Sequence, residues 1–180
     1  MPEIKLMEIE LDHLEEQIPG KRNRDSPPLH LWDPELSGDI DIVINADGEW
    51  IHQGGKIKRD SIVDLFSRIL RRESDGDYYL VTPGEKWRIQ VESHPLIVVD
   101  VDRHGTGKSQ VLIVTLNNGK RLEIDTDHPL SQEPLRERVA VVALEHGLSA
   151  LFSRAAWYRL AEMIDPQGNL WSAGQCYHLE

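Results

Sequence analysis

The chain has 180 residues, of which 39% are hydrophobic and 28% are charged, and this composition is typical of a soluble globular protein with one full domain or two small ones. Its formal net charge of −11 argues against binding to a nucleic-acid polymer or to an anionic membrane, because both need basic residues that neutralise phosphates. The single cysteine, Cys176, excludes an internal disulfide, and no apolar run reaches the roughly 18 residues of a membrane span, so we expect a cytoplasmic protein.

The N-terminal segment is expected to form a polar helix over residues 3–18, followed by a linker up to residue 26. From Gly38 onward, apolar and polar residues alternate, which predicts a half-buried strand. Asp47-Gly48 then predicts a two-residue hairpin turn that pairs Ile44 with Ile51. In that register, one face carries the isoleucines and the other carries polar and aromatic residues, namely Asp39, Asp41, Asn45, Trp50 and His52.

Residues 60–72 are expected to form an amphipathic helix, because apolar residues recur there at helical spacing. Asp60 or Ser61 can cap its N-terminus. A second hairpin follows, with its turn at Pro83-Gly84. With a two-residue turn, this hairpin places Tyr79 opposite Arg88 and Val81 opposite Lys86.

The second half of the chain is richer in strands. Strands are predicted over residues 96–101, 110–116, 121–125 and 139–144, and a last one over 170–179, in which Cys176 is expected to be buried. Ser153 can cap a helix that extends to about Ile164 and buries Trp157 or Tyr158. Both halves therefore combine antiparallel strands with one main helix, which indicates an α+β fold and a modest case for duplication.

Three motifs in the first half carry a family resemblance: GDID at residues 38–41, DGEW at residues 47–50 and YYLVTPGEK at residues 78–86. With weaker matches at DTDHPL and LWSAG, the chain resembles the DUF1285 family of bacterial proteins over residues 27–179. The resemblance implies two similar small α+β domains, the second like a pleckstrin-homology fold. It also implies a site between the domains for a nucleotide-like ligand in signalling, and no established catalytic residues.

The expected organisation has three parts. Residues 1–26 form the N-terminal helix and linker, residues 27–94 the first α+β domain, and residues 95–180 the second, pleckstrin-homology-like α+β domain.

The candidate ligand site lies in the first domain, where the charge is locally basic. Residues 56–88 hold eight Lys and Arg against six Asp and Glu, a net of +2, while the rest of the chain holds twelve against twenty-five, a net of −13. A local basic surface suits a small anionic ligand, which paired cations can clamp while an aromatic ring stacks on it. The predicted ligand-binding residues are Trp32, Asp39, Asp41, Arg71, Tyr79, Lys86 and Arg88.

Each of these residues also has a structural interpretation. The cations can pair with nearby carboxylates, and Trp32, held between two prolines, can seal the core edge instead of lining a pocket. Asp39 and Asp41 could serve as an acid/base pair or as metal ligands, although solvated carboxylates are common on strand faces.

One apparent phosphate-binding motif is dismissed. Residues 105–109, GTGKS, resemble the end of a P-loop, but the leading glycine is absent, and a strand follows where a P-loop needs a helix. No other catalytic fingerprint occurs. We therefore expect no cofactor, no metal site and no catalytic residue.

The first functional hypothesis is a non-enzymatic ligand-sensing or signalling protein that binds a small anionic, nucleotide-like ligand between its two domains. The alternative is a protein–protein interaction adaptor, whose mark would be an exposed apolar patch or edge strand. A small hydrolase or metal-dependent enzyme built on the Asp clusters is the third hypothesis. A protein partner and a homodimer both stay open at this point.

Overall fold

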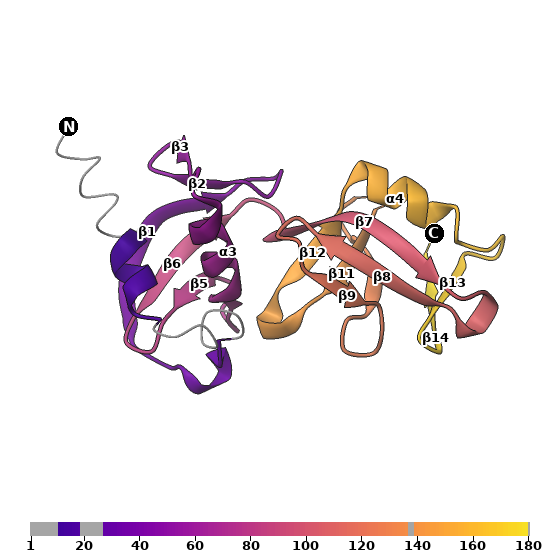
Figure 1. Cartoon of the computed structure of the whole chain (residues 1–180), viewed down its shortest axis with the longest axis horizontal. Helices are drawn as coiled ribbons and strands as arrows, with labels where there is room; N and C mark the ends of the chain where they lie inside the picture. Colours follow the sequence, from indigo (N-terminus) through magenta and orange to yellow (C-terminus); the bar gives the residue numbers. More distant parts are fainter. Residues whose placement is uncertain (1–10, 19–26, 137–138, 180) are drawn as a thin grey trace. The chain divides into compact units, whose positions relative to one another are not determined.

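The structure is a computed structural model that describes residues 11–18, 27–136 and 139–179. It divides into two compact units, Met1–Asn45 with Glu49–Glu92, and Ala46–Gly48 with Ser93–Glu180. We call them the first lobe and the second lobe, and Figure 1 shows a curled sheet in each. The expected helix over residues 3–10 and the linker over 19–26 lie outside the described residues, whereas residues 11–16 are helical as predicted.

The first lobe is a six-stranded sheet in the order β3-β2-β1-β6-β5-β4. Its strands are β1 (Leu36–Ile44), β2 (Trp50–His52), β3 (Gly55–Lys56), β4 (Leu70–Arg72), β5 (Tyr78–Val81) and β6 (Lys86–Val91). The central strands β1 and β6 are parallel, and all other neighbours are antiparallel. A short 3-10 helix, η1 (Leu29–Leu31), precedes the sheet, and α3 (Asp60–Arg68) follows β3.

The core of the first lobe forms where α3 packs its apolar side against the sheet. Ile62, Leu65 and Phe66 of α3 are buried, and so are Leu14 and Ile18 at the N-terminus. Burial of an amphipathic face supplies most of the stability of a helix as short as α3. The helix and the sheet therefore depend on each other.

The predicted register of the first hairpin is wrong by one residue. Ile44 pairs with Trp50, not with Ile51. Only Gly48 of the two predicted turn residues takes a positive φ, +80°, so the loop has three residues, closed where the Asn45 N–H donates to the Glu49 carbonyl at 2.9 Å. A shift of one residue moves every side chain to the other face.

The shifted register buries two residues that were expected on the polar face. Trp50 is 3% exposed and His52 is 1% exposed, both on the core side with the isoleucines. Asp39 and Asp41 remain on the exposed side of β1. The predicted polar face therefore keeps its carboxylates and loses its aromatic residues.

The helix predicted over residues 60–72 ends earlier than expected. It stops at Arg68, and Leu70–Arg72 form strand β4, which pairs with β5. Neither predicted cap holds, because the N-cap position is Arg59 and no side chain caps the helix. The second hairpin does have the predicted register, with Tyr79 opposite Arg88 and Val81 opposite Lys86.

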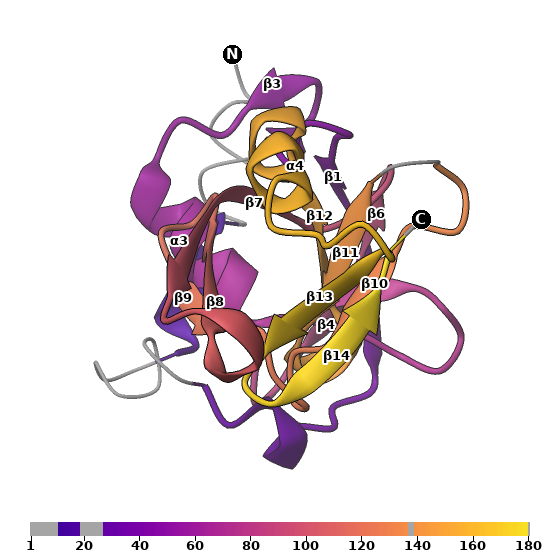
Figure 2. The same ribbon diagram turned by 90° about the vertical axis from the view of Figure 1, so that its right-hand side faces the viewer.

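The second lobe contains a sheet with the order β10-β11-β12-β7-β8-β9. Its strands are β7 (Leu96–His104), β8 (Val111–Leu116), β9 (Arg121–Glu123), β10 (Leu130–Gln132), β11 (Ala140–Ala143) and β12 (Ser149–Phe152). Of these, β10 and β12 were not predicted. A further hairpin pairs β13 (Asn169–Ser172) with β14 (Gln175–His178), both labelled in Figure 2. Leu170 of β13 and Leu179, which follows β14, are buried in the core of this lobe.

The two lobes share one topology. In each, three consecutive strands form an antiparallel ladder, three more form another, and the first and sixth strands join them in parallel: β1 with β6, and β7 with β12. The helix breaks the likeness, because α3 follows the third strand, whereas α4 (Arg154–Ala161) follows the sixth. Two similar lobes in an α+β fold are therefore confirmed, and the pleckstrin-homology likeness of the second stays a prediction.

Details of the second lobe confirm some of the remaining expectations and correct others. The side chain of Ser153 caps α4 by accepting from the Ala156 N–H, as predicted. Trp157 packs half-buried against the core, while Tyr158 is 56% exposed. Cys176 is exposed, so its predicted burial is wrong. Residues 105–109 connect β7 and β8, as expected of a loop that is not a P-loop. In the described part of the chain, no helix has the length and apolar character to cross a membrane.

Candidate functional site

The second hairpin brings three of the predicted ligand-binding residues together. The Lys86 ammonium lies 4.8 Å from the centroid of the Tyr79 ring, and the Arg88 guanidinium lies 5.8 Å from it. Tyr79 is only 3% exposed, so the two cations cover the ring in place of solvent. We call these three residues the tyrosine–cation cluster.

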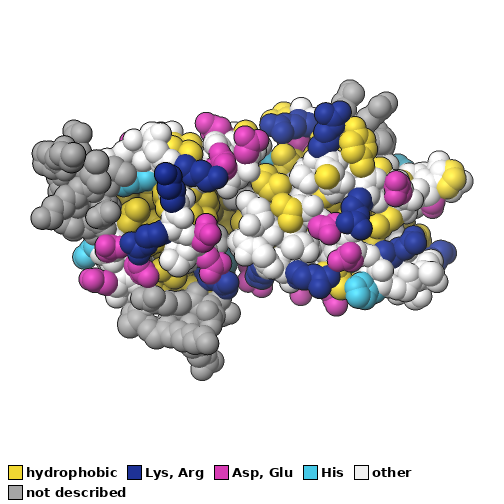
Figure 3. Space-filling model, turned by 45° about the horizontal axis from the view of Figure 1, so that its top comes forward, with side chains coloured by type: hydrophobic (Ala, Val, Ile, Leu, Met, Phe, Trp, Pro, Cys, Tyr) yellow, Lys and Arg dark blue, Asp and Glu magenta, His cyan; other side chains and the backbone are white. Residues whose placement is uncertain are grey.

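Carboxylates compensate the charges of this cluster. Lys86 Nζ lies 2.8 Å from Glu73, and Arg88 lies 3.5 Å from Asp39 and 3.4 Å from Asp77. Over the first lobe, Figure 3 shows basic side chains beside acidic ones. The locally basic sequence therefore folds into ion pairs, which favours the structural interpretation of these cations over an anion clamp.

Arg71 and Trp32 are joined through the backbone. The Arg71 guanidinium donates to the carbonyls of Leu29 and Trp32 at 3.1 and 2.8 Å, and it also pairs with Glu73 at 3.2 Å. Arg71 thus fastens η1 and the residue after it to strand β4. The half-buried Trp32 is positioned by this contact.

The carboxylates around the cluster are held in their charged form. Partial burial alone would raise the pKa of the Glu73 carboxyl, but hydrogen bonds from Lys86 and Arg71 outweigh it and place the pKa below its ordinary value of 4.5. A hydrogen bond from the Tyr79 hydroxyl, at 2.5 Å, lowers the pKa of Asp75. Both carboxylates stabilise the lobe only while they are ionised.

Glu73→Gln is expected to reduce the acid sensitivity of the first lobe. Because the folded-state pKa of Glu73 is depressed, its contribution is present above the ordinary value of 4.5 and is lost as the pH falls further. At neutral pH the variant should lose about 1–2 kcal/mol, since Lys86 and Arg71 lose their shared partner. Urea unfolding at several pH values checks this, with Glu35→Gln, at an exposed glutamate of the same lobe, as control. Equal acid sensitivity of wild type and Glu73→Gln would contradict it.

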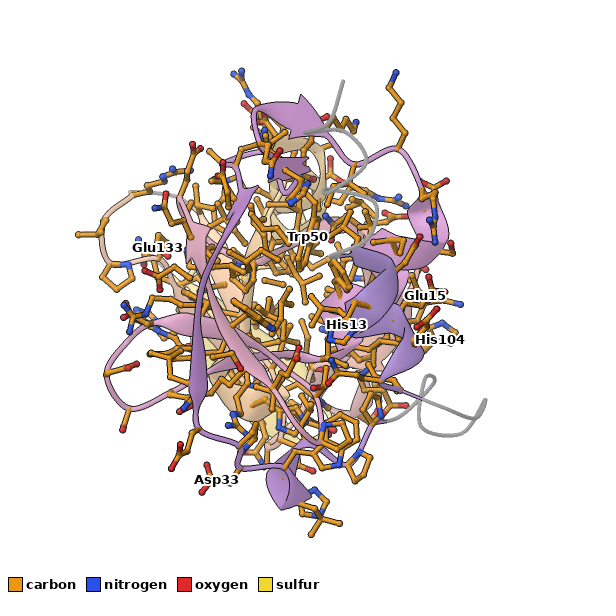
Figure 4. All side chains as sticks on the ribbon, turned by 90° about the vertical axis from the view of Figure 1, so that its left-hand side faces the viewer. His13, Glu15, Asp33, Trp50, His104 and Glu133 are labelled. Carbon is orange, nitrogen blue, oxygen red and sulfur yellow. The ribbon has the colours of Figure 1, made fainter. Side chains whose placement is uncertain are left out.

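Asp39 and Asp41 line a separate small pocket of about 210 Å³ in the first lobe. Both are exposed residues of β1. The other lining residues include Trp87 of β6 and His13 of the N-terminal helical segment. His13 is labelled in Figure 4. His13 is already bonded to Glu85 at 3.1 Å. The pocket is acidic at its rim and therefore does not suit an anion.

The other acidic clusters in the sequence have structural partners. Asp100 pairs with Arg159, and Asp102 pairs with Arg121 at 2.9 Å. Asp125 accepts the backbone N–H groups of Asp127 and His128. Across residues 11–18, 27–136 and 139–179, no three His, Cys, Asp or Glu residues are grouped so that they could hold a metal ion.

A larger pocket, of about 440 Å³, lies in the second lobe. Its lining combines two arginines, three aromatic residues and two aliphatic residues, namely Arg136, Arg154, Trp157, Tyr158, Phe152, Val139 and Leu151. We call it the aromatic–arginine pocket. Its volume falls in the range of about 300–1,000 Å³ that is usual for small-molecule sites.

The arginines of this pocket differ from those of the first lobe. Arg154 donates to the Tyr158 hydroxyl at 3.3 Å, and its guanidinium lies 5.8 Å from the centroid of that ring. The hydrogen bond to Tyr158 raises the pKa of Arg154 further. Among the residues that the structure describes, neither Arg136 nor Arg154 has a carboxylate partner. Both arginines line the same pocket.

A hydrogen-bonded chain of three side chains lies in the same lobe. His94 Nδ1 is 2.8 Å from the Ser149 hydroxyl, and His94 Nε2 is 2.7 Å from the Glu133 carboxylate. We call it the Ser149–His94–Glu133 chain.

Comparison with known proteins assigns the chain to a family. Residues 27–94 match the family described as "Domain of unknown function (DUF1285), N-terminal domain", and residues 95–179 match "Protein of unknown function (DUF1285), C-terminal domain". The chain belongs to the DUF1285 family. The resemblance carried by the sequence motifs is thereby confirmed.

Two solved DUF1285 structures are similar to this DUF1285 protein. One, from Silicibacter pomeroyi DSS-3, is 40% identical, with a TM-score of 0.80 over 90% of each chain. The other, from Shewanella baltica OS155, is 31% identical, with a TM-score of 0.56 over 68% of this chain and 91% of that one. No curated protein matches the chain.

The aromatic–arginine pocket of this DUF1285 protein was missed by sequence reasoning. Trp157 and Tyr158 were considered only as core residues, although Arg154 lies one helical turn before Tyr158, and that spacing places both on one side of a helix. Arg136 lies in a loop without periodicity, so only the fold brings it to the pocket.

Proposed function

We propose that this DUF1285 protein senses a small anionic ligand with a planar ring, such as a nucleotide-like molecule, by binding it in the aromatic–arginine pocket of the second lobe. The observation that carries the proposal is the pair Arg136 and Arg154, which face one pocket without a carboxylate partner in the described residues. A cytoplasmic location stays part of the proposal.

The chemistry of the pocket favours this ligand class. Guanidinium groups bind phosphate and carboxylate through two parallel hydrogen bonds. Trp157, half-buried beside them, offers a ring face on which a planar group can stack. Leu151 and Val139 add an apolar floor. By contrast, the cations of the tyrosine–cation cluster already have carboxylate partners.

The test compares three probes by calorimetric titration and thermal shift: adenosine monophosphate, adenosine and citrate. We expect adenosine monophosphate to stabilise the wild-type protein most, because it alone carries both the ring and the phosphate. In Arg154→Gln, its affinity should fall at least about tenfold, which is about 1.4 kcal/mol.

The matched control is Arg121→Gln. Arg121 lies in the same lobe, but it pairs with Asp102 and does not line the pocket. Its substitution should leave the affinity unchanged. The proposal fails if no probe stabilises the wild type at millimolar concentration, or if Arg154→Gln and Arg121→Gln bind equally well.

A further inference from the structure

The Ser149–His94–Glu133 chain has the geometry of a nucleophile, a base and an acid that orients the base. Its members come from three distant segments: His94 precedes β7, Glu133 follows β10 and Ser149 begins β12. Both of its hydrogen bonds, 2.8 and 2.7 Å, fall within the range of about 2.6–3.2 Å expected between a nucleophile and its base.

Glu133 is fixed by its own contacts. Its backbone N–H donates to the Val139 carbonyl at 2.8 Å, and its second carboxylate oxygen accepts the Leu135 N–H at 3.3 Å. The residue is 9% exposed, and Figure 4 labels it. A carboxylate held in this way orients the imidazole beside it.

The partners of His94 determine its tautomer. Since the Glu133 carboxylate can only accept, the Nε2 of a neutral His94 carries the proton and donates it. Nδ1 is then free to accept from the Ser149 hydroxyl. The two ring nitrogens exchange the roles they have in most serine hydrolases, but either nitrogen of an imidazole can accept a proton while the other donates.

The Ser149–His94–Glu133 chain lies beside the aromatic–arginine pocket. Ser149 and Leu151 point to the same face of β12, about 7 Å apart along the strand, and Leu151 lines that pocket. Ser149 is half-buried rather than fully enclosed. An acyl group seated on the apolar floor of the pocket would place a carbonyl near Ser149.

We propose that Ser149 is an activated nucleophile that cleaves carboxylic esters with an aromatic or apolar acyl group. Ser149 Oγ attacks the ester carbonyl while His94 Nδ1 takes the hydroxyl proton. The bond to the alcohol oxygen then breaks, and the alcohol leaves with that proton. Water then attacks the acyl-serine while His94 Nδ1 takes its proton, and that proton passes to Ser149 Oγ as the acyl bond breaks. In sum, ester and water become carboxylic acid and alcohol. Ser149 and His94 are the catalytic residues, and Glu133 is a positioning residue.

Ester cleavage goes beyond ligand binding and departs from the expectation of a protein without catalytic residues. Its test is covalent labelling of the full chain with an alkyl fluorophosphonate, read by intact mass and peptide mapping. We expect one adduct, on Ser149, without any added anion, so the result is independent of nucleotide binding. Ser149→Ala should give none, and His94→Gln should react at least about 100-fold more slowly.

The matched control is Ser131→Ala. Ser131 is an exposed serine of β10 that lies opposite Val141, and Val141 in turn pairs with Leu151. Ser131 does not belong to the Ser149–His94–Glu133 chain. Its substitution should leave labelling unchanged. For the positioning role, Glu133→Gln should slow labelling, and Glu133→Asp should restore part of the rate at equal thermal stability. Absence of a wild-type adduct at Ser149, or equal labelling of folded His94→Gln, would overturn the inference.

Discussion

Phe66→Ala is expected to destabilise the first lobe by about 3–5 kcal/mol. Phe66 is 0% exposed and packs against Trp50, with the two ring centroids 6.1 Å apart and the rings tilted by 50°. Truncation removes the largest of the fully buried side chains in the described residues. It also leaves a cavity between α3 and the sheet, because close-packed surroundings relax only partly.

Urea unfolding followed by tryptophan fluorescence measures this effect, and Trp50 reports on the same part of the core. Leu31→Ala is the control, since Leu31 is 71% exposed in the same lobe and should change stability by less than about 0.5 kcal/mol. A loss for Phe66→Ala that is no larger than for Leu31→Ala would mean that α3 does not seal this core.

Gly168→Ala should destabilise the second lobe through its backbone. Gly168 has φ +82°, and an added Cβ would lie 2.9 Å from the Leu179 carbonyl oxygen and 2.9 Å from His178 Cε1. The left-handed backbone alone costs roughly 1–2 kcal/mol. The clash adds to this because the Leu179 backbone is fixed: its N–H donates to the Gly168 carbonyl at 2.9 Å.

Gly174→Ala separates the cost of the left-handed backbone from the cost of the steric clash. Gly174 has φ +76°, and nothing lies within 4 Å of its added Cβ. It should therefore show only the backbone cost, which thermal unfolding of both variants can compare. If both variants lost the same stability, the close approach of residues 178–179 to Gly168 would not exist in solution.

The two hairpins of the first lobe show where sequence reasoning succeeds and where it fails. For Tyr79 and Arg88, the alternating sequence of β6 and a two-residue turn specify the register, and the prediction is confirmed. For Ile44, the Asp-Gly pair looked like a two-residue turn, but one extra loop residue shifted the register. Alternation fixes which residues share a strand face, while the turn alone decides which face its partner presents.

The segment Ile69–Arg72 shows why the helix end was misplaced. Its apolar residues fit helical spacing, yet Leu70–Arg72 find backbone partners in β5. A short apolar run is compatible with either structure, and the partner strand decides between them. β12 was missed for a related reason, because its four residues carry no alternation of their own.

The candidate sites were predictable only in part. Local pairing brought Tyr79, Lys86 and Arg88 together as expected, but their carboxylate partners Glu73 and Asp77 follow from the fold. Arg136 reaches the aromatic–arginine pocket from a loop. Glu133 and Ser149 lie 39 and 55 residues after their shared partner His94. No local pattern in the sequence could link the three residues.

Ligand binding at the aromatic–arginine pocket can be located directly by NMR. On titration with adenosine monophosphate, the indole N–H signal of Trp157 and the guanidinium Nε–H signal of Arg154 should move together and saturate. The indole signals of Trp50 and Trp87, both in the first lobe, should stay in place. Movement confined to the first-lobe indoles, or no movement at millimolar ligand, would contradict a ligand site in the second lobe.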